Sequence, residues 1–594
     1  MEGRGTKSKT LADLLPRAAE IYGDSPAVRY KDGQAWVDRS FSEVLEIVRP
    51  LALGLTELGI EKGDRVSILG NTRPEWTYFD FAALSIGATV VPIYQTNSPE
   101  ECRYVLDNSD AKVVIVEDDE QLAKVREVRS GLPRLEQVIL MTGSAEDAIS
   151  AEDLAAKGAA VDPSRWQQRY SEVSPSDICT FIYTSGTTGP PKGCVISHGN
   201  YRAMLDMINE TSVVENEDIS YLYLPLAHSF ALLIQLGSFD LGATIAYWEC
   251  DPLKILPNLA ELKPTYFPSV PRIFEKIYTA ATSGMEKEGG LKKAIFDWAI
   301  GVGAKMRKAE RSGRKPGFLL SRSYAFADKQ VLAKIRGLFG GNLRLAVSGA
   351  APINPEILRF FDAAGVLVLE GWGMTETSTA ATISTPDDFK VGTIGKPFTG
   401  CEVKIAADGE ILVKGANVFQ GYHKNEEATR ETIVDGWLHT GDIGEIDSDG
   451  FITITGRKKD IIITAGGKNI TPANLEAEIK QQPLVSQCVV VGDRRPYLVA
   501  LVTLDPEEAV AYAKEHGLSE DPAELAANPD IRAAIEGHVE KINQNFARVE
   551  QVKKIAILPH DLSQESGELT PTLKVKRAVV ATKHEQEIEQ LYAA

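Results

Sequence analysis

The sequence predicts an α/β fold: a large body of several subdomains, in which helices flank parallel sheets, followed by a smaller α+β domain. Short, continuous apolar runs alternate with helical patterns over most of the chain, and such runs are typical of parallel strands buried on both faces. After Gly456 the pattern changes to short strands and helices in a stretch of domain size. We therefore expect two units in this chain of 594 residues, 1–456 and 457–594.

Capping and apolar signals near the N-terminus predict the order of the first elements. Ser40 and Glu43 form a capping-box pattern ahead of apolar residues at three- and four-residue steps, which predicts a helix. An apolar run at 66–69, a helical segment over 74–86 that begins with proline, and a second apolar run at 89–93 follow. Strand, helix and strand in this order predict a parallel βαβ unit.

Residues 278–343 form a charged, helical segment with an exposed bend expected at 312–317. Basic side chains stand among apolar ones there, the pattern of one or two amphipathic helices. The basic residues are Lys292, Lys293, Lys305, Arg307 and Lys308. Such helices can lie on a membrane surface, or they can be packed helices with a solvated outer face. Both interpretations stay open on the sequence alone.

The C-terminal unit has its own alternation of elements. Apolar runs at 488–491, 497–503 and 554–558 predict strands, and the segments 506–516 and 531–547 predict helices. No internal repeat or low-complexity tract interrupts them. We therefore predict an independent α+β core in this part of the chain.

The overall composition limits the classes of ligand and partner that the protein can bind. There are 64 basic and 83 acidic residues, a net charge of −19, which argues against nonspecific nucleic-acid binding and against a general attraction to anionic lipid. Six cysteines lie without ligand spacing and eight histidines show no metal pattern, so we expect reduced thiols and no zinc. The N-terminal residues lack an apolar signal segment. We expect a cytoplasmic protein, with peripheral contact at the inner membrane face as a further possibility.

A loop at residues 183–193 is the most distinctive stretch of the chain. It holds four hydroxyl side chains, three glycines and one lysine, Lys192, in eleven residues. Glycine lets backbone N–H groups approach phosphate oxygens closely, and successive amides form an anion-binding nest, so the composition favours a polyphosphate ligand over a plain surface loop. Pro191 precedes the lysine and Gly193 follows it, which does not fit the Walker A loop of P-loop NTPases.

Together with four later motifs, this loop resembles the adenylate-forming ligase superfamily, and within it the long-chain fatty acyl-CoA synthetases of bacterial type. The motifs are residues 183–193, 372–376, 435–442, 456–460 and 571–577, in the family's order and over nearly the whole chain. Each motif alone is a weak signal, whereas five in sequence are specific.

The resemblance implies an ATP-dependent long-chain fatty acid:CoA ligase that forms AMP. A fatty acid would attack the α-phosphate of ATP to give acyl-AMP and pyrophosphate, and the thiol of coenzyme A would then displace AMP. ATP, Mg²⁺, a long-chain fatty acid and coenzyme A are the implied ligands. Two alternatives stay open: a fatty acyl-AMP ligase that serves a carrier protein, and a noncatalytic nucleotide- or lipid-binding relative.

The resemblance also assigns roles to the reacting groups. Lys574 matches the lysine that brings the two anions together, with Lys576 as its neighbouring alternative. Such a charge offsets like-charge repulsion and stabilises the transition state. Glu376 would hold Mg²⁺ on the phosphates, and the hydroxyl of Thr375 would contact the α-phosphate.

The remaining ATP contacts follow from the same motifs. Lys192 would clamp the departing pyrophosphate, Trp372 would stack on adenine unless it is only a core tryptophan, and Asp442 would accept from the ribose hydroxyls. The full expected set is Thr184, Ser185, Gly186, Thr187, Thr188, Gly189, Lys192, Gly349, Ala350, Ala351, Trp372, Gly373, Met374, Asp442 and Arg457.

The acyl and CoA sites are implied at three further places. His228 and Phe230 would border the fatty acid pocket, although a lone histidine is as often a core residue. Gly466, Gly467 and Lys468 would line the coenzyme A channel, with a plain turn as the alternative. Lys459 would be the hinge about which the small domain swings between the half-reactions, which makes that domain mobile.

Overall fold

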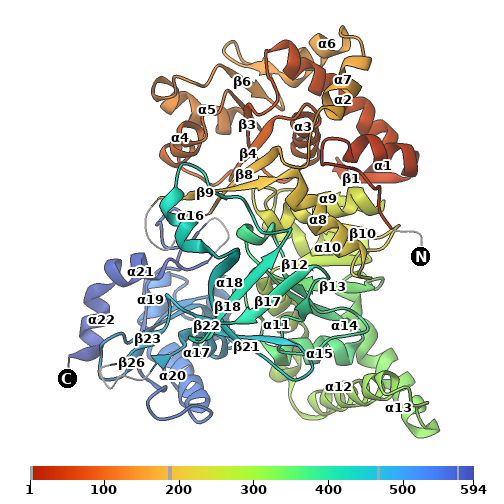
Figure 1. Cartoon of the computed structure of the whole chain (residues 1–594). Helices are drawn as coiled ribbons and strands as arrows, with labels where there is room; N and C mark the ends of the chain where they lie inside the picture. The colour runs from red at the N-terminus through yellow and green to blue at the C-terminus, as the bar shows by residue number, and fades with distance from the viewer. Residues whose placement is uncertain (1–3, 185–189, 465–468, 571–573, 594) are drawn as a thin grey trace.

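A computed structural model describes residues 4–184, 190–464, 469–570 and 574–593 of the protein. The chain forms a large body and a smaller C-terminal domain that lies against one side of it (Figure 1). The predicted fold class is confirmed, because two mostly parallel sheets with helices on their faces dominate the body.

The first sheet has eight strands and carries the glycine-rich loop near one edge. The six strands from β8 to β7 pair in parallel with their neighbours, whereas the β8–β9 and β9–β19 pairs are antiparallel. In spatial order the strands are β19 (Gly421–Tyr422), β9 (Lys192–Ser197), β8 (Ile178–Thr184), β4 (Thr89–Ile93), β3 (Arg65–Leu69), β5 (Val113–Val116), β6 (Gln137–Leu140) and β7 (Ile149–Ser150). The accompanying helices are α2 (Phe41–Glu57), α3 (Pro74–Ser85), α4 (Pro99–Asn108), α5 (Asp119–Val128), α6 (Ala151–Ala159) and α7 (Ser164–Ser171).

The second sheet has nine strands and supplies the nucleotide-side segments. Its strand order is β16 (Lys396–Pro397), β15 (Thr382–Ile383), β14 (Val368–Trp372), β13 (Leu345–Ser348), β12 (Tyr266–Ser269), β10 (Ile219–Leu222), β11 (Thr244–Tyr247), β1 (Pro26–Asp32) and β2 (Ala35–Ser40). Its helices are α1 (Leu14–Tyr22), α8 (His198–Asn209), α9 (Ser229–Leu241), α10 (Ile255–Leu262), α11 (Pro271–Glu288), α12 (Gly290–Arg311), α13 (Phe318–Ala327), α14 (Ala333–Gly337) and α15 (Pro355–Ala364).

The two sheets share one hydrophobic core. The largest buried cluster joins Val66 and Ile182 of the first sheet to Leu222 and Ile245 of the second, with residues of α3, α8 and α9 between them. Helices α3 and α9 are buried along almost their whole lengths, which explains why their sequences show no polar face. Loops from both sheets are thereby held in fixed relation to one another.

The local predictions near the N-terminus are confirmed. The Ser40 hydroxyl accepts from the Glu43 amide at 3.2 Å, and the Glu43 carboxylate accepts from the Ser40 amide at 2.8 Å, so the capping box opens α2. Strands β3 and β4 pair in parallel, with Val66 opposite Val90, on either side of α3.

A third sheet of the body is antiparallel, which the sequence analysis did not predict. It consists of β17 (Cys401–Ile405), β18 (Glu410–Gly415), β20 (Ile433–Val434), β21 (Trp437–Ile446) and β22 (Ile452–Arg457), with α16 (Glu426–Thr432) beside it. Along β21 most residues alternate between buried and partly exposed, as in a sheet with one solvated face. This alternation is the signal that would have distinguished these strands from the buried runs before them.

The C-terminal domain has hydrophobic clusters of its own and the predicted α+β composition. Its strands are β23 (Ile462–Ile463), β24 (Asn469–Ile470), β25 (Val485–Val491), β26 (Leu498–Leu504) and β27 (Val552–Ile557). Its helices are α17 (Pro472–Ile479), α18 (Pro506–His516), α19 (Pro522–Ala526), α20 (Pro529–Asn543), α21 (Arg577–Lys583) and α22 (Glu585–Tyr592).

The structure bears on cysteine pairing, membrane spans and metal ligands. All six cysteines are unpaired in the structure. Over the described residues, we find no helix that combines the length and apolarity needed to cross a bilayer. In the same part of the chain, no group of three or more His, Cys, Asp and Glu side chains is placed to hold a metal ion.

The close crossing of α12 and α15 gives a test of the packing. A Cβ added to Gly303 in α12 would lie 2.1 Å from the Ala363 carbonyl oxygen, whereas one added to Gly301 would meet nothing within 4 Å. We expect Gly303→Ala to destabilise the protein by about 1–3 kcal/mol through overpacking. The control Gly301→Ala should stabilise it by about 0.5 kcal/mol, because glycine is unfavourable inside a helix. Thermal unfolding of both variants checks this; equal melting temperatures would contradict the crossing.

Candidate active site

Glu376 and Thr375 lie in a short helical turn, Thr375–Thr377, that follows β14. Both side chains are buried, at 7% and 8% exposure. The Ser229 hydroxyl lies 3.5 Å from that of Thr375, so the turn sits over the start of α9. A carboxylate and a hydroxyl are thus presented side by side where a strand of the second sheet ends.

A tyrosine that the sequence analysis did not single out joins Glu376 to the glycine-rich loop. The Tyr422 hydroxyl donates to Oε1 of Glu376 at 2.6 Å, and the Lys192 ammonium lies 5.0 Å from the Tyr422 ring centroid. Burial, followed by the nearby Glu376 charge, raises the pKa of Tyr422, so its hydroxyl stays a donor. Strand β19 holds Tyr422 beside Cys194 of β9, two residues after Lys192. Lys192 and Glu376 therefore belong to one site.

Left-handed backbone follows the acidic turn. Ser378 has φ +48° and Thr379 has φ +96°, an unusual conformation for a β-branched residue. Hydrogen bonds hold it: the Asn417 amide donates to the carbonyls of Thr377 and Ala380, and the Thr379 hydroxyl donates to the Ser229 carbonyl at 2.8 Å. Backbone strain that surrounding contacts enforce is typical of functional sites.

Asp442 connects two other predicted contacts on the nucleotide side. The Trp372 indole donates to its Oδ2 at 2.9 Å, and the Arg457 Nε donates to its Oδ1 at 2.8 Å. The carboxylate is 7% exposed, and each of its oxygens keeps a second lone pair for a further donor. Trp372 thus has a positioning contact in addition to the stacking surface expected from the sequence.

Gly373 and Met374 complete this strand end. A Cβ added to Gly373 would lie 2.2 Å from the Thr379 carbonyl oxygen, so the left-handed segment folds directly onto this glycine. The Met374 amide donates to the Thr377 hydroxyl at 3.0 Å, which closes the turn. Glycine is required here by close approach of the backbone.

The segment after β13 lies against the predicted acyl pocket. A Cβ on Gly349 would contact the Phe230 ring at 3.3 Å, so these two expected ligand contacts are neighbours. Ala350 has φ +67°, a left-handed conformation that is uncommon for alanine, and Ala351 next to it is exposed. The structure thus brings the segments predicted for adenine and for the fatty acid side by side.

His228 caps the N-terminus of α9 and is neutral. Its Nδ1 accepts from the Phe230 amide at 3.1 Å, which leaves the ring proton on Nε2. Burial, followed by the positive charge of Lys574, lowers the pKa of His228 to about 3. The side chain is half-buried, so it is no closed core residue. This histidine is therefore a fixed N–H donor and no proton carrier near neutral pH.

Lys574 comes from the C-terminal domain and reaches the same site. Burial, followed by the Arg457 charge, lowers its pKa, while Asp442 and Glu376 favour its charged form. Part of the Lys574 side chain is nevertheless exposed to solvent. Many protein atoms therefore surround the ammonium, but solvent can still reach it. The Lys574 amide donates to the Thr570 hydroxyl at 3.0 Å, and its carbonyl accepts from the Thr570 amide at 2.8 Å. These bonds tie the Lys574 backbone to Thr570.

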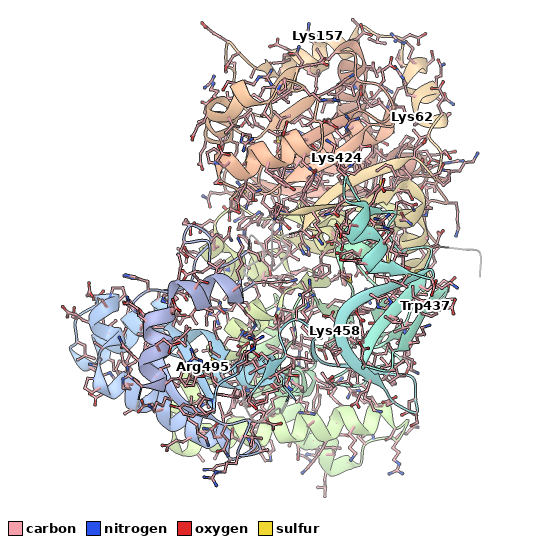
Figure 2. All side chains as sticks on the ribbon, turned by 60° about the vertical axis from the view of Figure 1, so that its left-hand side comes forward. Lys62, Lys157, Lys424, Trp437, Lys458 and Arg495 are labelled. Atoms are coloured by element: carbon pink, nitrogen blue, oxygen red, sulfur yellow. The ribbon has the colours of Figure 1, made fainter. Side chains whose placement is uncertain are left out.

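The segment expected to be a hinge is a turn between the body and the C-terminal domain. Strand β22 extends through Arg457, one residue beyond the expected boundary, and Lys459 is an exposed residue of the turn that follows. Lys458 is held by Asp408 at 2.6 Å and Glu410 at 3.1 Å. Lys458 lies on the side of the antiparallel sheet toward the C-terminal domain (Figure 2).

Two ion pairs cross between the domains in this arrangement. Arg272 of α11 lies 2.6 Å from Asp505, which caps α18, and Lys276 lies 3.4 Å from Glu507. Asp505 is mostly buried, at 12% side-chain exposure, so its pair with Arg272 is the better shielded of the two. The orientation that brings Lys574 to Glu376 therefore has contacts of its own.

Several expected site residues lie outside the described part of the chain. They are Ser185, Gly186, Thr187, Thr188 and Gly189 of the glycine-rich loop, and Gly466, Gly467 and Lys468 of the expected coenzyme A channel. The ends of the first segment are described: Thr184 pairs with Lys192 across the β8–β9 hairpin.

Comparison with protein families matches the chain over most of its length. Residues 15–423 match the AMP-binding enzyme family, and residues 459–594 match the AMP-binding enzyme C-terminal domain. The second matched segment begins at Lys459, the expected hinge residue, and residues 424–458 separate it from the first.

Named relatives are similar over nearly their full lengths. The chain is 42% identical to the long-chain-fatty-acid–CoA ligase FadD15 of Mycobacterium tuberculosis, over 95% of this chain and 94% of the relative. It is 31% identical to the long-chain-fatty-acid–CoA ligase ACSBG2 of Homo sapiens, over 98% of this chain and 92% of the relative.

Solved structures share the fold. The adenylation domain of a carboxylate reductase from Mycobacterium chelonae aligns with a TM-score of 0.77 at 22% identity, covering 99% of this chain and 92% of that one. A fatty acyl CoA synthetase from Mycobacterium tuberculosis aligns with a TM-score of 0.62 at 23% identity, covering 98% and 99%.

The contrasting surroundings of two lysines give a test of the site's electrostatics. The pKa of Lys574 is lowered, chiefly by burial, whereas that of Lys458 is raised by Asp408 and Glu410. Since only the neutral amine reacts with acetic anhydride, we expect Lys574 to become labelled at lower pH than Lys458. Mass spectrometry over a pH series measures both in one sample; a reversed order would contradict the described surroundings of Lys574.

Proposed function

The chain belongs to the AMP-binding enzyme family, and from this premise we propose that it is an ATP-dependent long-chain fatty acid:CoA ligase that releases AMP and pyrophosphate. The named relatives at 31–42% identity support the substrate class. We further propose that the body, residues 1–456, binds ATP and fatty acid, and that residues 457–594 move about Lys459.

One observation carries the proposal: two carboxylates of the body act on the pKa of a lysine from the small domain. The charges of Glu376 and Asp442 both favour the charged form of Lys574. Glu376 stands nearly two hundred residues before Lys574 in the sequence. Arg457 disfavours the charged form of Lys574, and the pKa of His228 is in turn lowered by burial and by the charge of Lys574. Such convergence of perturbed groups is typical of active sites.

In the first half-reaction, a carboxylate oxygen of the fatty acid would bond to the α-phosphorus while the bond to the β-phosphate oxygen breaks and pyrophosphate leaves. Both reactants are anions, so the Lys574 ammonium would lower their repulsion and stabilise charge on the α-phosphoryl oxygens. Neutral His228 would donate its Nε2–H to the acid. Thr375 would contact the α-phosphate and Lys192 the departing pyrophosphate.

In the second half-reaction, the sulfur of coenzyme A would bond to the acyl carbon as the bond to the AMP oxygen breaks, with loss of the thiol proton. We propose that the small domain turns at Lys459 and withdraws Lys574 for this step. The Arg272–Asp505 pair would then break, because it joins the two domains in the orientation described. Gly466, Gly467 and Lys468 remain the proposed coenzyme A contacts.

Glu376 is the proposed holder of Mg²⁺. A hard cation takes carboxylate and phosphate oxygens, and a single carboxylate with ATP oxygens satisfies it without a cluster of protein ligands. The Tyr422 hydroxyl uses only Oε1 of this buried carboxylate, which fits such a role. When bound, Mg²⁺ would neutralise charge on the phosphates.

The substrate class is tested with ATP, coenzyme A and saturated acids of increasing chain length. We expect pyrophosphate release together with acyl-CoA, most efficiently for long chains, because each buried methylene contributes about 0.8 kcal/mol. Pyrophosphate release without acyl-CoA would favour the fatty acyl-AMP ligase alternative. No pyrophosphate with any acid would favour the noncatalytic alternative.

The role of Lys574 is tested by separating the half-reactions. We expect Lys574→Ala to slow acyl-AMP formation by about 10²–10³-fold, as when one preorganised charge is removed, while thioester formation from supplied acyl-AMP persists. The matched control Lys576→Ala, two residues along the same loop, should keep both. Equal loss of both half-reactions in Lys574→Ala would contradict the proposed domain swing.

A further inference from the structure

Helices α12 and α13, residues 290–327, form a helical hairpin that projects from the body at the end opposite α6 (Figure 1). The bend between them, residues 312–317, lies where the sequence predicts it. Both interpretations of this segment, a solvated packed helix and a membrane-binding helix, can now be compared with its exposed surface.

The outer surface of the hairpin is unusually apolar. On α12, Leu291, Ile295 and Trp298 follow one another at helical spacing and are 77%, 37% and 42% exposed. On α13, Phe318 and Leu319 are 73% and 80% exposed. A solvated face of a packed helix would carry polar residues at these positions.

The apolar rows of the two helices join. The ring centroids of Trp298 and Phe326 lie 6.0 Å apart, and Phe326 is itself 56% exposed. Leu319 precedes Phe326 by seven residues and therefore lies on the same side of α13. The Arg322 guanidinium lies 5.6 Å from the ring centroid of the neighbouring Phe318. The hairpin thus presents an exposed apolar strip, to which both helices contribute, with a cation beside it.

The charge of the hairpin opposes that of the whole protein. Residues 290–327 carry nine basic residues and two acidic ones, a net charge of +7 in a chain of −19. The basic residues are Lys292, Lys293, Lys305, Arg307, Lys308, Arg311, Arg314, Lys315 and Arg322. Lys305 continues the row of Leu291 and Trp298 at seven-residue steps, and Arg314 and Lys315 lie exposed in the bend.

The base of the hairpin is firmly packed. Ala299 and Val302 of α12 are buried with Ala327 and Leu332, and Gly303 lies against the Ala363 carbonyl of α15. The Arg307 guanidinium donates to the Tyr324 hydroxyl at 2.8 Å and so links the two helices. The exposed strip is therefore held by a folded support and does not belong to a loose end.

We propose that the helical hairpin is a docking surface for an anionic lipid bilayer. Aromatic and aliphatic side chains flanked by lysine and arginine are the chemistry of interfacial helices, which bury their apolar side at the headgroup level and draw anionic lipid with their cations. The local charge of +7 supplies the attraction that the acidic protein as a whole lacks. Binding would be a property of this surface and goes beyond the proposed function, since it needs neither ATP nor coenzyme A.

The full-length protein is tested by co-sedimentation with vesicles of phosphatidylcholine alone and of phosphatidylcholine with phosphatidylglycerol. We expect binding to the anionic vesicles that weakens as salt rises, because the screening length falls to about 10 Å at 0.1 M ionic strength. Phe318→Ser with Leu319→Ser should weaken binding at least about tenfold, since it removes two exposed apolar anchors. Arg314→Glu with Lys315→Glu should do the same by reversing charge.

Matched variants elsewhere serve as controls. Leu253→Ser changes a leucine that is 74% exposed outside the hairpin, and Lys157→Glu with Arg494→Glu reverses two exposed cations outside it. Lys157 lies at the opposite end of the molecule (Figure 2). These controls should bind vesicles as the unaltered protein does, and circular dichroism and melting temperature show that each variant folds.

Three results would overturn the proposal. They are no binding of the unaltered protein to anionic vesicles, equal binding of hairpin and control variants, and a dimer in sedimentation analysis that only the hairpin variants dissolve. The last would show that a second copy of the chain covers the strip. Because none of these measurements uses the reaction, they are independent of a failure of the proposed ligase activity.

Discussion

The electrostatic coupling of one ammonium of the C-terminal domain to two carboxylates of the body is the constraint on which the rest of the structure depends. Lys574 can meet Glu376 and Asp442 only if the C-terminal domain lies against the body. Burial makes uncompensated carboxylates costly, so Arg457 is paired with Asp442, and the contacts of Lys574 with Thr570 hold a further cation in reach. The shared core of the two sheets, in turn, fixes the loops that carry the acids.

Positioning contacts around the acids are as specific as the acids themselves. Asn417 holds the carbonyls on either side of the left-handed residues Ser378 and Thr379, and Tyr422 holds the carboxylate of Glu376. Unfavourable backbone geometry persists there because several hydrogen bonds act on it together. The body thus holds Glu376 and its neighbours in a preorganised arrangement, whereas the Lys574 ammonium is supplied by the C-terminal domain.

Sequence patterns predicted those elements whose signals are local. Helix α18 has the expected bounds, because Asp505 caps its start and Gly517, in left-handed conformation, ends it. Helix α20 ends four residues before the expected Ala547, at Asn543, whose side chain bonds to Val552 of β27. That contact joins the helix end to a strand that follows it, and it leaves no mark in the periodicity of the helix.

The same holds for the site: local sequence patterns do not reveal contacts between residues that are far apart along the chain. The roles of Glu376 and Lys574 came from a resemblance, and no local pattern joins two residues that lie so far apart along the chain. Tyr422 was missed because a tyrosine in a two-residue strand carries no signal of its own; only the pairing of β19 with β9 brings it beside Glu376. The antiparallel sheet was missed because the alternating apolar and polar residues of strands such as β21 were not distinguished from the continuous apolar runs of the parallel strands.

The carboxylate of Asp442 has a thermodynamic consequence. Its oxygens accept from Trp372 and from Arg457, and Arg457 stands two residues before the proposed pivot. A ligand hydroxyl that competes for Asp442 would alter the restraint on Arg457 and thereby the balance between domain orientations. By linkage, the orientation must alter the affinity for that ligand by the same factor. Through Asp442, ligand binding can therefore shift the equilibrium between domain orientations, and the orientation can shift the ligand affinity.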